Sequence, residues 1–473
     1  MTRTRTFLVC TAPVACVACV ALALAACGDD GSGPDVAPPD AGSDVTSEPE
    51  TSTDASVRPD ADARAPFDPA DEPVTCTSTP CAVQIVAGDD HFCTRMSDGT
   101  VRCWGSDNFG ALGRGGEPGE DDPGPDAGWS VSAVAGLSGV TQLSAAGATT
   151  CARVEEPSAP GEPKIMCWGS NEYGQLGLGG DGVADFDPHP APEPVALARD
   201  LGALRVDVGH RSACVVAPSG DAVCWGSNEQ LQLGRESLEL ILGPDVASAG
   251  QPLAARVIPA AHSTLVVTRD GEVWSWGAVA LPFGTVGGRI ASLSPDPLAG
   301  RVGAIAKVTS IAASGWVEDS ESPEPSPPRA HACAIADGEV HCWGQTYRAA
   351  LCTGLPDSER TPAHAPSYTE AWPQQVAVSD ELTCVRMTDG TVRCCGEDRR
   401  GRLGRGNVGS FVNGFVKATA LQGKAVQVAT SNGAVCALLQ GGTVACWGSN
   451  ANGELGQPDA DELEHPSPLL VRF

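Results

Sequence analysis

The residues of this 473-residue chain with the clearest capacity for chemistry are cysteines that recur in pairs. Residues 93–103 read CTRMSDGTVRC and residues 384–394 read CVRMTDGTVRC, so each copy holds two thiols ten positions apart. Paired thiols can bind a metal ion or form a disulfide. The spacing differs from the two-residue spacing of the usual zinc knuckles, and no second Cys or His pair recurs beside it, so we favour disulfides.

Short strands joined by tight turns must position these cysteines. Runs of four to six residues with β-branched side chains, such as VQIVAG and LRVDVG, precede the cysteine segments, and Gly, Asp and Asn interrupt them. Gly99 and Gly390 stand where a three-residue hairpin loop needs a left-handed residue, and Asp337-Gly338 offers a two-residue turn. Both turns bring the two cysteines opposite each other on antiparallel strands, within reach of a bond. The six predicted hairpin disulfides are Cys93–Cys103, Cys151–Cys167, Cys214–Cys224, Cys333–Cys342, Cys384–Cys394 and Cys436–Cys446.

Three further observations complete the cysteine pattern. In the fourth copy both positions change, to Leu265 and Ser275, as expected if each cysteine is useful only with its partner. We predict a local bridge between Cys76 and Cys81. Cys352 and Cys395 are left over, and we predict that they pair between neighbouring copies.

The cysteine segments belong to a larger repeat. Seven copies align on a Trp-Gly pair or its equivalent, about 57 residues apart. Most copies continue with a motif of the form xNxxGxLG. The copies are marked by Trp104, Trp168, Trp225, Trp276, Trp343, Cys395 and Trp447.

Several of these stretches resemble the regulator of chromosome condensation repeat family. They include GDDHFCTRMSDGTVRCWGSDNFGALGRG (88–115), CWGSNEYGQLGLG (167–179) and CWGSNANGELG (446–456), and the resemblance covers about residues 82–473. It implies an all-β fold, a seven-bladed β-propeller of four-stranded blades. Trp104 and its equivalents are then packing residues between blades, and His91 and His331 are hydrogen-bonded core or loop residues rather than catalysts.

A propeller must also close its ring by pairing its two chain ends. The final PSPLLVRF resembles the strand that opens a blade. We therefore expect Leu469–Arg472 to complete the first blade as its missing strand.

The amino terminus has the parts of a secretory signal. Arg3 and Arg5 precede an apolar run, and LAAC (24–27) resembles the lipobox of bacterial lipoproteins. The resemblance implies cleavage before Cys27 and lipidation of that residue; the alternative is an ordinary signal peptide and free secretion. Either reading implies export, which supplies the oxidising compartment that disulfides need. Residues 28–75, with 13 acids against two arginines, predict a disordered tether, and residues 76–473 form the folded body.

The charge of the folded body and its lack of catalytic motifs narrow the classes of function that the sequence allows. The folded body carries 46 acidic and 26 basic side chains, which disfavours nucleic acid and anionic lipid head groups as partners. We find no nucleophile elbow, zinc helix motif or phosphate loop, and we expect neither a cofactor nor enzyme activity. Asp181, Asp185 and Asp187 have spacings that a calcium ion could use, but a solvated acidic loop is the favoured interpretation.

Five insertions differ between the copies, and loops of this kind carry the function of repeat proteins. They are 115–130, 179–194, 235–250, 315–329 and 353–372. Counting strand reversals places all five on one face of the ring, opposite the Asp-Gly turns and the stretch 155–163. Four aromatic residues are candidate anchors for a partner unless they fold back over their own loops: Trp129, Trp316, Tyr368 and Trp372.

These features predict a monomeric, non-catalytic binding or scaffold module, displayed on the cell envelope by a lipid anchor and contacting a protein or a glycan. One alternative is an inhibitor of a secreted or envelope enzyme. Another is a propeller lyase or hydrolase with its site at the central mouth, which would need polar residues converging there from several blades.

Overall fold

The computed structural model describes residues 73–115, 130–156, 158, 161–198, 201–247, 250–260, 262–279, 286–291, 294–303, 305–315, 330–346, 348–354, 358–366 and 370–473. The predicted signal peptide, Cys27 and the tether up to residue 72 lie outside these ranges.

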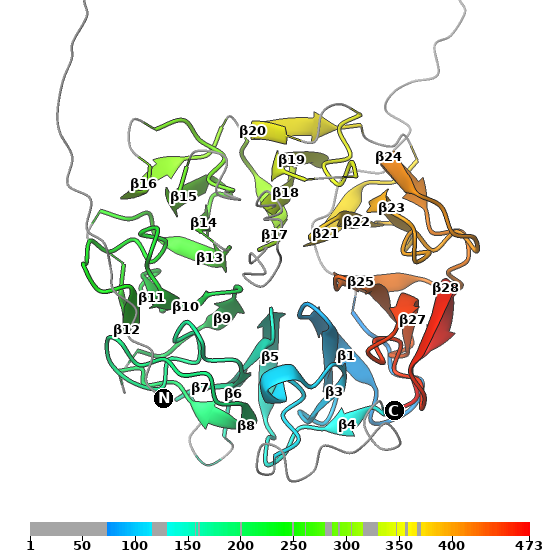
Figure 1. Cartoon of the computed structure of the whole chain (residues 1–473), viewed down its shortest axis with the longest axis horizontal. Coiled ribbons are helices and arrows are strands. Elements are labelled where there is room, and N and C mark those ends of the chain that lie inside the picture. Colours follow the sequence, from blue (N-terminus) through cyan, green and yellow to red (C-terminus); the bar gives the residue numbers. More distant parts are fainter. Residues whose placement is uncertain are drawn as a thin grey trace, which may run out of the picture. The chain divides into compact units, whose positions relative to one another are not determined.

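The described residues form seven antiparallel sheets of four strands, each made by a continuous stretch of chain. The sheets stand around a ring with their first strands at the centre (Figure 1). The predicted seven-bladed β-propeller is therefore confirmed. In blade order, the strands are β1 (Ala82–Ala87), β2 (His91–Met96), β3 (Val101–Gly105) and β4 (Ser132–Ala133); β5 (Val140–Ala146), β6 (Thr149–Val154), β7 (Lys164–Gly169) and β8 (His189–Pro194); β9 (Arg205–Val208), β10 (Ser212–Val216), β11 (Ala222–Ser227) and β12 (Ile241–Val246); β13 (Ala254–Pro259), β14 (Ser263–Thr268), β15 (Val273–Gly277) and β16 (Asp296–Arg301); β17 (Val308–Ala313), β18 (Ala330–Ala336), β19 (Glu339–Gln345) and β20 (Ser358–Ala365); β21 (Pro373–Ser379), β22 (Leu382–Met387), β23 (Val392–Glu397) and β24 (Phe411–Lys417); β25 (Ala425–Thr430), β26 (Ala434–Leu439), β27 (Val444–Asn450) and β28 (Asp461–Leu470).

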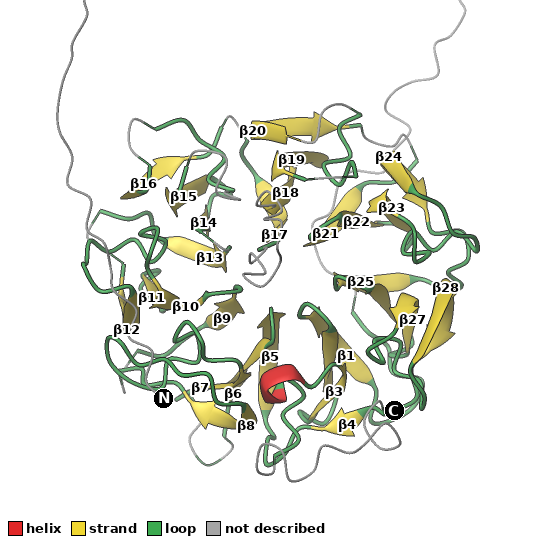
Figure 2. Cartoon of the chain, viewed as in Figure 1, coloured by secondary structure: helices red, strands yellow, loops and turns green. Residues whose placement is uncertain are grey.

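Helix is almost absent from the part of the chain that the structure describes (Figure 2). One 3₁₀ turn, η1 (Asn108–Gly110), follows β3. This agrees with a sequence of short β-branched runs separated by Gly, Asp and Asn.

The predicted closure of the ring is wrong. The C-terminal strand β28 pairs with β27 of its own blade, where Leu469 lies opposite Cys446, and β4 already supplies the fourth strand of the first blade. The Pro-containing segment that follows each Trp-Gly is the outer strand of the same blade, so the sequence-based count began each blade one strand too early.

Side chains and the amino-terminal segment close the ring instead. The backbone nitrogens of Thr75 and Ala82 donate to the carbonyls of Gln440 and Gly442 in the last blade, at 2.7 and 3.1 Å. Trp104 of the first blade donates from Nε1 to the carbonyl of Glu454, 2.9 Å away, and meets the ring of Phe473 edge-on. One buried cluster therefore spans the first and last blades.

The second and third strands of each blade form the predicted hairpins. The paired cysteines lie directly opposite each other, as in the register of Cys93 with Cys103, with Cα atoms 4.1 Å apart in all six hairpin disulfides. Gly99 and Gly390 have φ angles of 80° and 79°, which explains the Asp-Gly turns. The structure also joins Cys76 to Cys81 and Cys352 to Cys395.

Buried tryptophans link consecutive blades. Trp168 Nε1 donates to the carbonyl of Ala111 at 2.9 Å, and Trp225 Nε1 to that of Gln175 at 2.8 Å, in each case in the preceding blade. Trp104, Trp276, Trp343 and Trp447 make the same kind of bond. The tryptophans are therefore packing residues between blades.

Blade 6 replaces this contact with a covalent bond. Elsewhere the tryptophan approaches a glycine of the preceding blade so closely that a Cβ at Gly177 would lie 2.7 Å from Trp225 Nε1. At the corresponding positions of blades 5 and 6 the chain has Cys352, with φ of 58°, and Cys395. Because Cys395 is far smaller than tryptophan, the Cβ of Cys352 fits and the two sulfurs bond across the blades.

Candidate functional site

The strand register assigns every loop to one of two faces. The links from first to second strand and from third to fourth strand open on one face, which we call the insertion face, because Ala87 pairs with Phe92 and His91 with Gly105. The Asp-Gly turns and the connections between blades open on the other, which we call the turn face: Val140 donates to the carbonyl of Gly99 there.

Two insertions on the insertion face are locked together between blades 2 and 3. Gly182 donates its backbone hydrogen to the carbonyl of Ile241 at 2.9 Å, and Asp181 Oδ1 accepts from the nitrogen of Gly243 at 2.9 Å. The loop preceding β8 and the start of β12 therefore form one surface rather than two separate loops.

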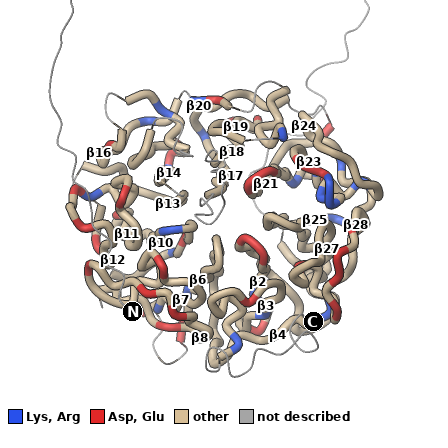
Figure 3. Tube along the Cα trace, viewed as in Figure 1, with Lys and Arg blue, Asp and Glu red and all other residues tan. Residues whose placement is uncertain are grey.

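This surface exposes large apolar side chains, which we call the apolar patch. Phe186 is 77% exposed and Leu238 is fully exposed; Val183 and Leu240 are also exposed. Asp181, Asp187, Glu236 and Glu239 add acidic exposed positions on the same two loops. Figure 3 shows that acidic positions outnumber basic ones along the trace near β12 and β7.

The aromatic residues proposed from the sequence lie elsewhere. Trp129, Trp316 and Tyr368 fall outside the described residues. Trp372 is half-buried and precedes β21, where its carbonyl accepts from the nitrogen of Thr388 beside the Asp389-Gly390 turn. Trp372 therefore belongs to the turn face, because β20 runs from the insertion face to the turn face and Trp372 follows it in the sequence.

The structure does not gather the three aspartates into a calcium site. Asp185 accepts from Asn171 Nδ2 at 2.8 Å and contacts His189 Nε2 at 2.9 Å, whereas Asp181 binds the backbone of Gly243. Within the described residues no cluster of three or more Asp, Glu, His or Cys side chains has the arrangement of a metal site. Asp181 and Asp185 act as loop-stabilising acceptors, and the backbone nitrogen of Asp187 donates to Asp185 Oδ1 at 3.2 Å.

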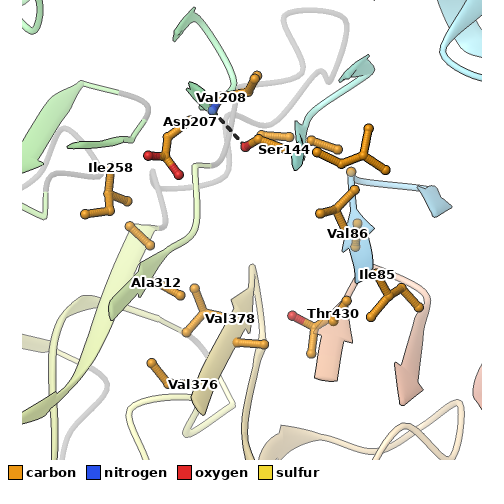
Figure 4. Close-up of a pocket in the computed structure, with 18 of the residues that line it drawn as sticks. Ile85, Val86, Ser144, Asp207, Val208, Ile258, Ala312, Val376, Val378 and Thr430 are labelled. Carbon is orange, nitrogen blue, oxygen red and sulfur yellow. Dashed lines mark hydrogen bonds between the residues drawn. The ribbon is translucent and has the colours of Figure 1, made fainter. Parts of the chain in front are cut away.

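The first strands surround a central cavity of about 600 Å³ (Figure 4). Figure 4 shows side chains from successive blades, among them Ser144, Ile258, Ala312 and Val378, arranged around it. The hydroxyl of Ser144 accepts from the nitrogen of Val208 in the next blade at 3.0 Å.

A recurrent glutamine joins neighbouring first strands. Gln142 donates from Nε2 to the carbonyl of Val206 at 2.6 Å and accepts from the nitrogen of Val206 at 2.8 Å. Gln84 forms the same pair of bonds with Leu143, and Gln375 with Val428; Gln427 accepts from the nitrogen of Ile85. We call Gln84, Gln142, Gln375 and Gln427 the clasp glutamines, since they satisfy backbone groups that the neighbouring blade's first strand leaves unpaired.

Arginines take the clasp position in blades 3 and 4. Arg205 binds Asp207 through Nε and Nη2 at 2.6 and 2.7 Å, and Arg256 Nε lies 3.7 Å from the same carboxylate. All three residues line the central cavity, and Asp207 is buried. Arginine has no acceptor, so it cannot reproduce the bond that a glutamine oxygen receives from the next strand.

Charged residues also converge at the mouth of the cavity on the insertion face. His210 Nε2 lies 2.8 Å from Asp89 Oδ1, and the carbonyl of Asp89 accepts from the nitrogen of Asn432 at 2.7 Å. Burial lowers the pKa of His210, but the charge and hydrogen bond of Asp89 and the charge of Asp380 raise it by more, so this pKa lies above its ordinary value. The sequence did not reveal this group, because its members come from four different blades.

The two histidines singled out in the sequence are structural. His91 Nε2 lies 2.8 Å from Thr150 Oγ1 in the next blade, and His331 Nε2 lies 2.8 Å from Thr383 Oγ1. Burial lowers the pKa of His91 to about 4 and that of His331 to about 3, so both are neutral at pH 7.

The repeat can now be identified. Residues 82–111 and 164–216 match the family models described as the regulator of chromosome condensation (RCC1) repeat. These two stretches of the chain, in blade 1 and across blades 2 and 3, are similar to the RCC1 repeat. Each matched stretch contains one of the Trp-Gly pairs that mark the copies, at Trp104 and Trp168.

Curated proteins are similar to this chain in sequence. The chain is 24% identical over 393 residues to the ultraviolet-B receptor UVR8 of Arabidopsis thaliana, covering 82% of each protein. It is 29% identical over 199 residues to the human E3 ubiquitin-protein ligase HERC2, which is 41% of this chain and 4% of HERC2, so that match concerns a small part of a much longer protein.

Solved structures show the same fold. Human WBSCR16 superposes with a TM-score of 0.61 at 19% identity, over 81% of this chain and 95% of that one. Yeast RCC1 (Prp20), in its complex with Kap60, gives 0.60 at 16% identity, over 84% and 87%. These similarities support the propeller fold, and the disulfides indicate an extracellular or otherwise oxidising compartment. No helix among the described residues is long and apolar enough to cross a membrane.

Proposed function

We propose that this protein is a non-catalytic binding module of the cell envelope that holds a protein or glycan partner on its insertion face. The observation that carries the proposal is the apolar patch, where Phe186 and Leu238 stand exposed on two interlocked insertions. An exposed group of large apolar side chains with a polar rim is typical of an interaction surface. The acidic rim favours a partner with an apolar centre and basic surroundings.

The construction of the patch supports this proposal. Asp181 and Gly182 tie the first insertion to β12, so the patch is held in place before any partner arrives. A preorganised surface loses less conformational entropy on binding than two free loops would. Repeated positions of the blades are buried in the core, whereas these exposed apolar side chains occur where the copies differ.

We further propose that the propeller is exported and held at the envelope by lipid on Cys27, with residues 28–75 as its tether. The oxidising compartment that the disulfides require supports export. Mass spectrometry of the mature amino terminus tests the anchor: a diacylated Cys27 is expected, and an unmodified amino terminus at another residue contradicts it.

Two alternative functions, an enzyme inhibitor and a propeller enzyme, can each be tested specifically. An inhibitor of a secreted or envelope enzyme would use the same apolar patch, and inhibition of such an enzyme by the purified protein would identify it. The group formed by Asp89, His210 and Asp380 favours a propeller enzyme with its site at the central mouth. Loss of a measured hydrolase or lyase activity in His210→Asn, with the fold retained, would support that alternative.

The binding proposal is tested by capture of partners from the native envelope. We expect Phe186→Ser combined with Leu238→Ser to reduce capture about tenfold or more, because contacts at the centre of an interface dominate affinity. Leu298→Ser is the matched control, since Leu298 is an exposed leucine on the outer strand β16. Unchanged capture by the double variant would exclude the apolar patch as the contact surface.

A further inference from the structure

The loop that carries Phe186 is closed by a single carboxylate. Phe186 lies between Asp185 and Asp187, and Asp185 Oδ1 accepts from the backbone nitrogen of Asp187 at 3.2 Å. The other oxygen, Oδ2, accepts from Asn171 Nδ2 at 2.8 Å, which ties the loop to the residues that follow β7. The position of Phe186 in the apolar patch therefore depends on the groups that hold the Asp185 carboxylate.

His189, the first residue of β8, contacts this carboxylate and a second one. Its Nε2 lies 2.9 Å from Asp185 Oδ1, and its Nδ1 lies 2.6 Å from Glu193 Oε1. An ionised carboxylate only accepts hydrogen bonds, and a neutral imidazole has one donor nitrogen and one acceptor nitrogen. Only the protonated ring can donate to both carboxylates, so this geometry is that of an imidazolium.

The neighbouring charges favour the same protonated ring. Burial lowers the pKa of His189, but the hydrogen bonds and charges of Glu193 and Asp185 raise it by more, so this pKa lies above its ordinary value. The bonds that Asp185 receives from Asn171 and His189 correspondingly hold the pKa of that carboxyl below its usual range, although burial opposes them.

The elements packed around β8 bring further charged groups, which are engaged elsewhere. On blade 1, Arg114 Nη1 lies 3.8 Å from Asp107 Oδ2. On blade 3, Arg235 donates from Nη2 to two backbone carbonyls of its own blade. Lys164 lies at the opposite end of β7 from the residue that pairs with His189. Within the described ranges, the two carboxylates are thus the charged groups that contact the imidazole.

Blade 7 contains a related turn with one carboxylate fewer. Asp461 Oδ1 accepts from the backbone nitrogen of Leu463 at 2.9 Å and lies 2.9 Å from His465 Nε2. Leu469 stands where blade 2 has Glu193, since each lies opposite the second cysteine of its own hairpin. Among the described residues, the histidine between two carboxylates therefore belongs to the blade that carries the apolar patch.

We propose that His189 is a proton-dependent clamp for the Phe186 loop, so that the apolar patch binds its partner more tightly when this histidine is protonated. The inference rests on the proposed binding function of the patch. Loss of the proton leaves one N–H for two carboxylates and removes the positive charge beside Asp185, and bonds between opposite charges are the stronger ones. The clamp is complete below pH 6.5 and is lost as the pH rises through the raised pKa of the folded protein.

Fluorine NMR of the full-length protein with 4-fluorophenylalanine at position 186 tests the clamp without a partner. We expect the resonance to shift in one transition between pH 6 and 9. In His189→Lys it should stay constant, because lysine keeps its positive charge throughout this range. In Glu193→Leu, which introduces the side chain of blade 7, the transition should move to lower pH, since a neutral ring can then satisfy Asp185 alone.

Three results of this titration would overturn the clamp. They are a resonance that does not respond to pH in the unaltered protein, the same transition in His189→Lys, and an unmoved transition in Glu193→Leu.

Capture of partners from the native envelope at pH 6 and at pH 8.5 tests the effect on binding. We expect capture to fall about fivefold or more at pH 8.5 in the unaltered protein and by less than about twofold in His189→Lys. An equal fall in both proteins would overturn the regulation, because the loss would then come from other groups. Absence of capture at both pH values would instead overturn the proposed function, and the fluorine transition would then decide the clamp by itself.

Discussion

At the scale of residues, the repeats change in matched pairs. Glycine and tryptophan meet at six interblade contacts, whereas Cys352 and Cys395 replace both at the contact of blades 5 and 6. Within a blade, Gln175 binds Ser170 at 3.3 Å, and the corresponding residues of blade 6, Arg402 and Glu397, form a buried ion pair at 2.5 Å. Each position therefore depends on its partner rather than on the repeat consensus.

The replacement of a glycine–tryptophan pair by Cys352 and Cys395 predicts that a second substitution can rescue the first. We expect Cys395→Trp alone to lower the melting temperature strongly, because its indole would meet the Cβ of Cys352 and the disulfide would be lost. Adding Cys352→Gly should recover much of the loss by recreating the contact seen between Gly177 and Trp225. Thermal unfolding followed by circular dichroism under oxidising conditions measures both, and a double variant no more stable than Cys395→Trp would contradict the exchange.

The buried histidines predict a pH dependence of stability. Since burial lowers the pKa of His91 to about 4 and of His331 to about 3, the unfolded chain binds protons below pH 6.5 that the folded chain cannot bind. The free energy of unfolding should therefore fall as pH decreases from 7.5 to 5.5, by about 1 kcal/mol for each histidine. Chemical denaturation at both pH values measures it.

The control for this prediction is a variant carrying His91→Gln and His331→Gln. It should be less stable at pH 7.5 but lose less stability on acidification, because the other titrating groups are unchanged. An equal loss in both proteins would show that these histidines do not remain neutral in the folded state.

At the scale of elements, the sequence predicts the structures that are fixed by residues close together in the chain. The cysteine spacing and Gly99 fix a hairpin without reference to the rest of the chain, and the structure pairs the same cysteines. The clasp glutamines could not be predicted in this way, because Gln142 contacts Val206 across a blade boundary and its strand register shifts there. The apolar patch could not be predicted either, since Phe186 and Leu238 belong to two separate insertions that are tied together only by bonds such as that of Gly243 with Asp181.

The clasp glutamines of different blades are expected to contribute similar amounts to the free energy of unfolding. Gln142→Ala and Gln375→Ala should each lower the free energy of unfolding by about 1 to 3 kcal/mol, because each leaves a backbone donor and acceptor of the next blade unpaired. Urea denaturation of the two variants measures this. A variant as stable as the unaltered protein would show that its glutamine does not hold the neighbouring strand.

At the scale of the whole molecule, the number of blades is predictable and the way the ring closes is not. Seven copies give seven blades, since each copy supplies four strands. The assignment of Leu469–Arg472 to the first blade failed because short Pro- and Val-containing segments look alike whether they open or finish a blade. Only the pairing of Leu469 with Cys446 distinguishes the two.

The closure predicts a difference between two neighbouring residues. Val471 is buried in the cluster that joins the first and last blades, whereas Arg472 is exposed. Val471→Asp should lower the free energy of unfolding by about 3 kcal/mol or more, because it buries a charge without a partner, and Arg472→Asp should change it by less than about 0.5 kcal/mol. Equal effects in thermal unfolding would contradict this closure.

The most direct test of the proposed function is site-specific photo-crosslinking in the native envelope. A crosslinking amino acid at position 186 reports on the apolar patch, and one at position 98, in an exposed Asp-Gly turn, reports on the turn face. We expect a discrete adduct from position 186 that disappears when Leu238→Ser is added, and none from position 98. An adduct from position 98 alone, or adducts of equal yield from both positions, would contradict a binding surface on the insertion face.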